Sequence, residues 1–244
     1  MNKPVLGESI TISSSWTKIK QAGQEAIINP RIWVPLLGAV LLQVDNLDNE
    51  ISDHLREHTP VFGSTERASN RSDDLASLTT VAYVSTALLA PGPAGGGGEW
   101  FTTKAKLLGS EWLAVKTARS MTSGLKSLTK RDRPNNLEDR SLPSGHATRA
   151  SAQAQMANLN VEYLPINSGA QQTLKWTFDG LAALTGWARV EAGMHFPSDV
   201  LAGWALGHFI ADLAKGFINP HQEVIQVYPQ SLGEGIGFRL VIRF

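Results

Sequence analysis

The stretch RSLPSGHATRA, residues 140–150, decides the fold and the site that we expect for this chain. Its Pro143–His146 portion predicts a tight turn, and the Ala-rich residues that follow have helical spacing. A helix that opens on Ser144, Gly145 and His146 presents free backbone N–H groups and the positive end of its dipole to an anion. Gly lets a ligand approach the backbone closely, and His exchanges a proton near neutral pH. By itself, the stretch also fits a capped helix with a surface histidine.

Helical patterns extend from this stretch in both directions, because apolar residues repeat at helical spacing through most of the chain. The polar segment 64–74 is expected to be a connector, with Asp73 or Asp74 opening the next helix. The charged, Pro-containing segment 130–142 is expected to be a loop. The helices that we expect cover 15–27, 46–58, 73–90, 99–128, 144–160, 171–187 and 198–217. The pattern therefore predicts an all-α chain folded as a helical bundle.

Two segments depart from that pattern. PGPAGGGG at 91–98 is the strongest helix breaker, and we expect a mobile loop there, because the helices on either side are too sparse to form separate cores. From Phe238 to Phe244 the side chains alternate with a period of two, which predicts a small β-hairpin over 221–244. We expect one domain, 1–244, in which 1–98 supplies N-terminal helices and the Gly-rich loop, 99–218 the helical core that holds the site, and 221–244 the hairpin tail.

The composition excludes several classes of site. Basic and acidic residues number 22 each, so no net charge favours nucleic acid, and any cationic site must come from local clustering. The absence of cysteine excludes disulfide frameworks, thiolate zinc sites and cysteine nucleophiles. With 42% hydrophobic and 18% charged residues, the chain can bury a substantial core.

The apolar run IWVPLLGAVLL at 32–42 leaves two readings open. It has the length of the apolar part of a signal peptide, but no small-residue cleavage site follows it, and it is too short to span a bilayer as a helix. It is either a buried or interfacial helix, or an uncleaved anchor or membrane-surface helix. Residues 75–90 are a second candidate, which Ser and Thr make less apolar.

Charged groups recur in three segments: KSLTKRDRP at 126–134, PSGH at 143–146 and ARVEAGMHFPSD at 188–199. The cationic side chains of Lys126, Arg133 and Arg189 can neutralise the nonbridging oxygens of a phosphoryl group. His195 and Asp199 stand four residues apart where a helix begins, so the carboxylate can orient the imidazole and stabilise its cation. Two histidines allow two roles, one attacking phosphorus and the other protonating the leaving oxygen.

These segments resemble the motifs of the type 2 phosphatidic acid phosphatase family, which shares its site with vanadium haloperoxidases and bacterial class A acid phosphatases. The family pattern is Lys-x6-Arg-Pro, then Pro-Ser-Gly-His, then Ser-Arg-x5-His-x3-Asp, and the chain matches nearly all of it in order between Lys126 and Asp199. Two departures are Ala188, which stands where the family has Ser, and the spacer of eight residues between Pro134 and Pro143.

The resemblance implies a helical-bundle phosphatase that needs no metal. His195 would be the nucleophile that forms a phosphohistidine, Asp199 would orient it, and His146 would be the general acid and later the base. Phosphate would be bound by Lys126, Arg133, Ser144, Gly145 and Arg189. Vanadate is expected to bind as a transition-state mimic. The implied substrate is a phosphorylated lipid or a small phosphate ester, and the implied location is the cell envelope, in the periplasm or at the membrane.

Two other functions stay open at this point. A vanadate-dependent haloperoxidase would use the same residues, and a non-catalytic protein that binds lipid phosphates could keep the fold. The complete set of motif residues argues against the second.

Several residues outside the motifs have plainer interpretations. Lys130 and Arg131 are expected at a solvated rim, and Arg149 either at the rim of the site or in a salt bridge. His208 is expected to be a hydrogen-bonded core histidine. His54 and His58 have metal-binding spacing but no evident third ligand. The tryptophans are expected to pack in the core, with an interfacial belt as the alternative.

Overall fold

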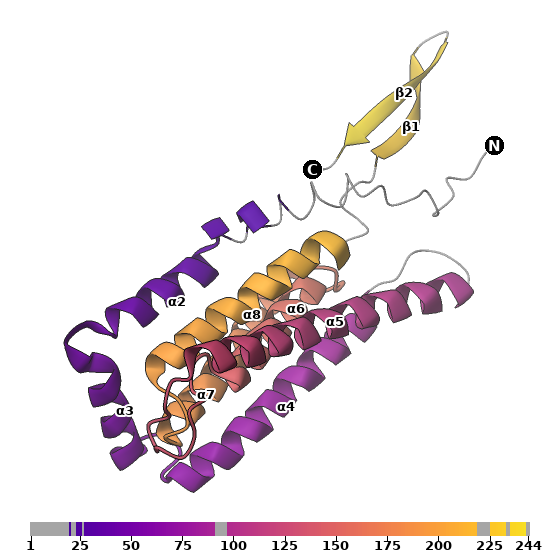
Figure 1. Ribbon diagram of the computed structural model, residues 1–244. Coiled ribbons are helices and arrows are strands. Elements are labelled where there is room, and N and C mark those ends of the chain that lie inside the picture. The colour runs from indigo at the N-terminus through magenta and orange to yellow at the C-terminus, as the bar shows by residue number, and fades with distance from the viewer. Residues whose placement is uncertain are drawn as a thin grey trace.

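The computed structural model describes residues 20, 23–25, 27–90, 97–218, 225–232 and 235–242, and over that part the chain is a helical bundle, as predicted (Figure 1). Its helices are α2 (Pro30–Leu41), the short 3-10 turn η1 (Val44–Asn46), α3 (Leu47–His58), α4 (Thr65–Leu89), α5 (Gly97–Thr129), α6 (Gly145–Val161), α7 (Ser168–Glu191) and α8 (Pro197–Ile218). The expected helices at 46–58, 99–128, 144–160, 171–187 and 198–217 are confirmed to within a few residues.

Helix α6 lies at the centre of the bundle and contacts α4, α5, α7 and α8 (Figure 1). Most of its 17 residues are buried, and many of them are Ala, Ser or Thr. Small side chains let neighbouring helices approach closely. The approach is closest on α8, where a Cβ added at Gly207 would lie 1.9 Å from Ser151 Oγ and 2.4 Å from the carbonyl oxygen of Thr148. A Cβ added at Gly203 would likewise lie 2.6 Å from the Ser144 carbonyl oxygen, so α8 is held against the start of α6, where one of the motifs lies.

Helix α4 corrects one expectation. The segment 64–74 is not a connector, because α4 already begins at Thr65, with Ser64 Oγ accepting a hydrogen bond of 3.1 Å from the Arg67 N–H. Ser64 is therefore the N-cap, in place of Asp73 or Asp74. Many polar residues in the first turns of α4 face solvent, while small residues such as Ala68 and Ser72 are buried. A narrow buried face of small residues does not produce a clear apolar pattern, so the sequence concealed the first turns of this helix.

Some expectations fall partly outside the described residues. The helix expected at 15–27 does so for most of its length, and so do residues 91–96 of the Gly-rich loop. Gly97 and Gly98 begin α5 and do not belong to that loop. Strands β1 (Ile225–Leu232) and β2 (Gly235–Ile242) pair antiparallel. The other residues of the tail expected over 221–244 lie outside the described residues.

Helix α2 leaves most of its apolar residues on the surface. Within it only Ile32 is buried, while Trp33, Leu37 and Val40 are each about half exposed or more. Of the helices that the structure describes, none combines the length and the hydropathy needed to cross a bilayer. The expectation of core packing is wrong for several tryptophans. Those that are exposed are Trp33, Trp112, Trp176 and Trp187.

His208 of α8 is buried, as expected, but it is not hydrogen-bonded. Neither ring nitrogen has a partner among the described residues, and the ring packs 5.1 Å from that of Trp204. Burial, followed by the charge of Arg31, lowers the pKa of His208 to about 3. The ring is therefore neutral and serves as a packing residue. Helical position indicates burial correctly here, whereas hydrogen bonding depends on neighbours that the sequence does not identify.

The contact between α6 and α8 can be tested with Gly207→Ala. Because the added Cβ would meet backbone atoms of α6, we expect a loss of about 3 kcal/mol in the free energy of unfolding, measured by urea denaturation. Gly180→Ala is the control. Gly180 lies inside α7 with no atom within 4 Å of its added Cβ, so Ala should stabilise the helix by up to about 1 kcal/mol. Equal stability of the two variants would contradict this close approach.

Candidate active site

The three motif segments converge at one end of the bundle. Lys126 lies in the last turn of α5, Gly145 and His146 in the first turn of α6, and Arg189 in the last turn of α7. After α7 the chain makes a tight turn, and His195 lies at the end of that turn. This turn passes through Gly193, whose φ of +66° favours glycine and whose added Cβ would lie 2.8 Å from Arg56 Cδ.

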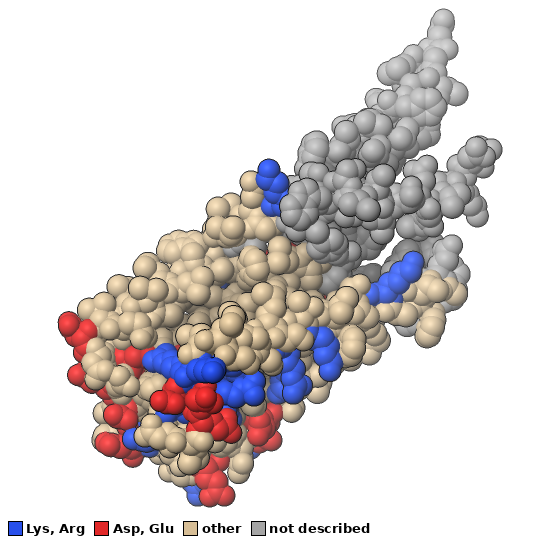
Figure 2. Space-filling model, in the orientation of Figure 1, with Lys and Arg blue, Asp and Glu red and all other residues tan. Residues whose placement is uncertain are grey.

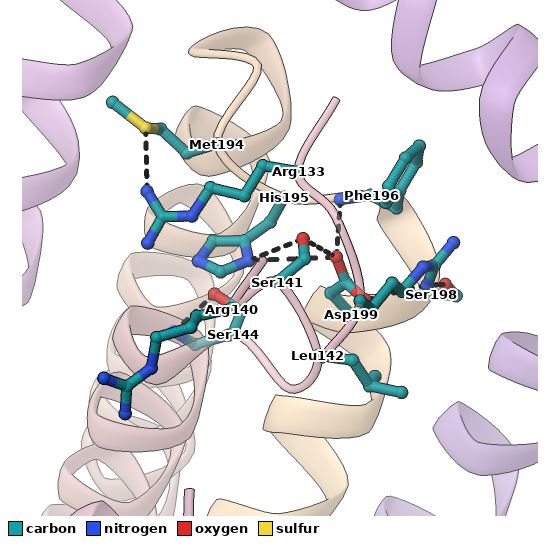
Figure 3. Close-up of polar contacts among 12 residues, drawn as sticks. Arg133, Arg140, Ser141, Leu142, Ser144, Met194, His195, Phe196, Ser198 and Asp199 are labelled. Carbon is teal, nitrogen blue, oxygen red and sulfur yellow. Dashed lines mark hydrogen bonds and ion pairs between the residues drawn. The ribbon is translucent and has the colours of Figure 1, made fainter. Parts of the chain in front are cut away.

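Asp199, fully buried in the first turn of α8, is the centre of the polar contacts (Figure 3). Its Oδ2 accepts hydrogen bonds from Ser141 Oγ at 2.5 Å and from the Phe196 N–H at 2.9 Å. His195 Nδ1 lies 3.8 Å from the same oxygen and 3.5 Å from Ser141 Oγ. The Ser141 hydroxyl, the imidazole and the carboxylate therefore form a triangle of contacts that fixes the orientation of the ring.

The titration of this pair follows from burial and charge. Burial, partly offset by Asp199, lowers the pKa of His195 to about 4, so the imidazole is neutral at physiological pH. Burial would raise the pKa of Asp199, but the contacts with His195, Ser141 and Arg131 outweigh it and lower that pKa. The site thus holds a neutral, buried imidazole next to a buried carboxylate.

Arg131 corrects the expectation of a solvated rim. One of its guanidinium nitrogens lies 2.8 Å from Asp199 Oδ1 and 2.8 Å from Ser198 Oγ, and the other lies 2.7 Å from Asp48 Oδ2. Asp48, buried at the start of α3, also accepts a bond of 2.9 Å from the Ser198 N–H and one from the Ser198 hydroxyl. The guanidinium also stacks 4.1 Å from the ring centroid of Phe196. Arg131 is therefore the cation that joins two buried carboxylates.

Within the described residues, none of the three expected phosphate-binding cations pairs with a buried carboxylate. Lys126 Nζ donates to the backbone carbonyls of Arg140 and Ser141. Arg133 pairs with the exposed carboxylate of Glu138 at 2.9 Å, and Arg189 donates to Ser72 Oγ at 3.1 Å. In both arginines the Nε is buried without a hydrogen-bond partner among the described residues.

These cations also act on one another. Burial, followed by the charge of Arg133, lowers the pKa of Lys126 to about 8. Burial and the charge of Arg133 likewise lower the pKa of Arg189. Cations that destabilise one another in this way favour an anion between them.

The first turn of α6 contributes the remaining expected residues. Ser144 is the buried N-cap, its Oγ accepting from the Ala147 N–H at 3.5 Å, and its own N–H bonds to the Asp199 carbonyl oxygen at 2.9 Å. A Cβ at Gly145 would be 3.7 Å from Thr122, an ordinary contact, so packing alone does not require glycine there. His146 Nε2 lies 2.7 Å from Asp73 Oδ1. Burial, then the charge of Arg189, lowers the pKa of His146, partly offset by Asp73.

Comparison with known proteins gives the same assignment as the motifs. The model of the PAP2 superfamily matches residues 107–222, a region that includes every expected site residue. Residues 107–222 therefore form a PAP2 superfamily region. It is 37% identical over 78 residues to phosphatidylglycerophosphatase B of Bacillus subtilis (strain 168), a match that covers 32% of this chain and 38% of that protein. A crystal structure of a transmembrane PAP2-type phosphatidylglycerolphosphate phosphatase from Bacillus subtilis aligns over 87% of this chain and 98% of its own, with 22% identity and a TM-score of 0.47.

The sequence does not identify several residues that hold the motif segments in place, among them Asp48, Ser72, Asp73 and Ser141. Asp48, Ser72 and Asp73 lie before residue 107, outside the matched PAP2 region. Each has an ordinary local role, as a first-turn acid or as a polar helix residue, so no spacing reveals its contact. Ser141 lies two residues before Pro143 of the PAP2 motif, where only its burial distinguishes it.

The other charged candidates do not join the site. Lys130 is exposed, as a rim residue would be. His54 and His58 stack on each other 4.2 Å apart, and no group of three potential metal ligands occurs in the described part of the chain. Arg149 forms no ion pair with the residues that the structure describes.

The Arg131 contacts can be tested by thermodynamics alone. Arg131→Met leaves the carboxylates of Asp48 and Asp199 buried without their cation, so we expect about 3 kcal/mol of lost stability at pH 7 in urea denaturation. Adding Asp48→Asn should recover part of that loss, because one unpaired charge is removed. The control, Lys130→Met, changes the same charge at an exposed neighbour and should stay near wild type. Losses that simply add in the double variant would contradict the coupling.

Proposed function

We propose that this PAP2 protein is a phosphatase that hydrolyses a phosphate ester or pyrophosphate of a phosphorylated lipid through a phosphohistidine. The observation that supports the proposal best is the neutral, buried His195 held by Asp199 and Ser141 beside three cations without buried carboxylate partners. A neutral imidazole is a nucleophile, and clustered cations attract a phosphoryl group.

In the first step His195 Nε2 attacks phosphorus. The proton resides on Nδ1, which faces Ser141 Oγ and the Asp199 carboxylate, so the lone pair on Nε2 is free. The N–P bond forms as the bond between phosphorus and the leaving oxygen breaks. The imidazole becomes cationic, and the buried negative charge of Asp199 stabilises that cation.

His146 handles the proton. In its protonated form it gives a proton to the leaving oxygen, and Asp73, 2.7 Å from Nε2, favours that form. Neutral His146 then takes a proton from water as the water attacks phosphorus. The N–P bond breaks, inorganic phosphate forms, and His195 returns to its neutral state.

Binding of phosphate falls to Lys126, Arg133 and Arg189, with the first N–H groups of α6 around Gly145 as uncharged donors. These groups neutralise the charge on the nonbridging oxygens, and we propose that no metal is required. Vanadate, which adopts the geometry of the transition state, should inhibit by binding to the same groups.

The lipid part of the proposal comes from two observations. The 78-residue stretch shared with phosphatidylglycerophosphatase B supports a phosphorylated lipid substrate. The exposed apolar side chains of α2, such as Trp33, Leu37 and Val40, support contact with a membrane surface. We therefore propose a location in the cell envelope, with the site within reach of lipid headgroups.

The nucleophile is tested by His195→Ala. With EDTA present, wild type should release phosphate from p-nitrophenyl phosphate and from phosphatidic acid in detergent micelles, and the variant should lose about 10³-fold or more in kcat/KM. His54→Ala, at an exposed histidine that contacts none of these groups, is the matched control. Phosphate release that survives in His195→Ala would show that another residue attacks.

The pH profile tests the division of roles. The value of kcat/KM should rise with pH through about 4, because His195 attacks only when neutral. It should fall again on the alkaline side, first as His146 loses its proton from a pKa below 6.5, and then near pH 8 as Lys126 loses its charge. Initial rates with p-nitrophenyl phosphate from pH 3.5 to pH 9 check both limbs. A steady rise into alkali would rule out His146 as the acid.

A further inference from the structure

Arg149 is a cation next to the site that no motif uses. It lies on α6 one turn after Gly145 and His146, so its side chain emerges on the same face of the helix. It forms no ion pair or hydrogen bond within the described part of the chain, and its Nε is buried without a partner. A half-buried guanidinium that lacks a carboxylate partner is unusual, because burying a charge is costly unless it is paired.

Arg119 of α5 stands opposite Arg149 by the packing of the two helices. Thr129 at the end of α5 donates a hydrogen bond of 2.9 Å to the Leu142 carbonyl oxygen, and a Cβ added at Gly145 of α6 would lie 3.7 Å from Thr122 of α5, so α6 runs back along α5. Arg119 lies one turn before Thr122 on α5, and Arg149 lies one turn after Gly145 on α6. Lys126 of the proposed phosphate site lies one turn after Thr122 on α5.

The charges around the pair are consistent with this placement. Burial and then the charge of Arg119 lower the pKa of Arg149, and the charge of Asp73 opposes them. Arg149 in turn lowers the pKa of His146. Asp73 is exposed and already accepts a hydrogen bond from His146, so it does not neutralise both guanidinium groups. Figure 2 shows Lys and Arg side chains gathered along the α5 part of this face.

We propose that Arg119 and Arg149 form a second anion subsite, which binds a second phosphate group of the same substrate. This inference rests on the proposed function, because the first phosphate occupies the site beside His195. The subsite lies about one helical turn, roughly 5.4 Å, along α6 from the first. That spacing suits a second phosphate joined through a short linker, as in a headgroup that carries both a phosphodiester and a phosphomonoester, and the long arginine side chains can also reach one joined directly, as in a diphosphate.

The subsite would set specificity without taking part in bond breaking. A substrate with one phosphate leaves Arg119 and Arg149 unpaired, whereas a substrate with two phosphates pairs them. The difference in binding between the two substrate types is therefore the quantity that these arginines control. Charge-assisted hydrogen bonds from a partly desolvated guanidinium change affinity by about tenfold or more.

The test compares the binding of methylphosphonate, with one phosphonate group, and methylenediphosphonate, with two that phosphatases cannot separate. Titration calorimetry gives both dissociation constants for wild type, Arg149→Gln, Arg119→Gln and the control Lys116→Gln. Lys116 lies one turn before Arg119 on the same helix and packs over Trp112 instead. We expect methylenediphosphonate to bind wild type about tenfold more tightly than methylphosphonate, and this ratio to fall toward one in both arginine variants but not in the control.

Two results would overturn the inference: equal affinity of wild type for the two ligands, or a ratio that neither arginine variant changes. Arg119 is exposed, so Arg119→Gln should fold normally even if Arg149→Gln does not. Hydrolysis of p-nitrophenyl phosphate is measured separately. If wild type hydrolyses this ester but shows no preference for methylenediphosphonate, the second subsite is wrong while the proposed phosphatase stands. If it hydrolyses no ester and binds neither ligand, the proposed function fails as well.

Discussion

The buried carboxylate of Asp199 is the interaction on which this end of the molecule depends. Its oxygens accept hydrogen bonds from Ser141, Phe196 and Arg131, and its backbone carbonyl accepts the Ser144 N–H. One residue therefore ties the start of α8 to the loop before α6 and to the N-cap of α6. A buried charge is costly unless its oxygens are fully paired, so these partners cannot be lost singly without a large penalty. The same carboxylate orients His195, so the fold at this end of the bundle and the geometry of the site both depend on Asp199.

The sequence reveals the parts of the site that obey a spacing. Lys126, Arg133, His146, Arg189 and His195 lie at fixed intervals within motifs, and the structure brings those motifs to one end of the bundle. Helices with broad apolar faces were predictable for the same reason. The exceptions are helices whose buried faces are narrow or rich in small residues, such as the start of α4, and the exposed apolar face of α2.

The parts that the sequence conceals depend on contacts across the chain. Arg131 resembles the solvated residues around it, and only Asp48, 83 positions away in the sequence, makes it a structural cation. Asp48 looks like an acid in the first turn of a helix, which is favourable with no tertiary partner at all. Each residue has a sufficient local explanation, so neither suggests the other. Pairings of this kind become visible only when the helices are placed.

The cations at this site are of two kinds: some are paired with carboxylates of the protein and have a structural role, and others lack such a partner and are candidates for binding a ligand. Arg131, which touches two buried carboxylates, has its charge satisfied by the protein, and its guanidinium can hold elements together but has little left to offer a ligand. Arg189 and Arg149 have no ion pair in the described part of the chain, and their Nε atoms are buried without partners. The fold holds Arg189 near the charge of Arg133 and Arg149 near that of Arg119, and an anion bound at either pair would offset the repulsion within it. A cation that the protein leaves unpaired beside a buried imidazole is therefore better explained by a ligand than by stability.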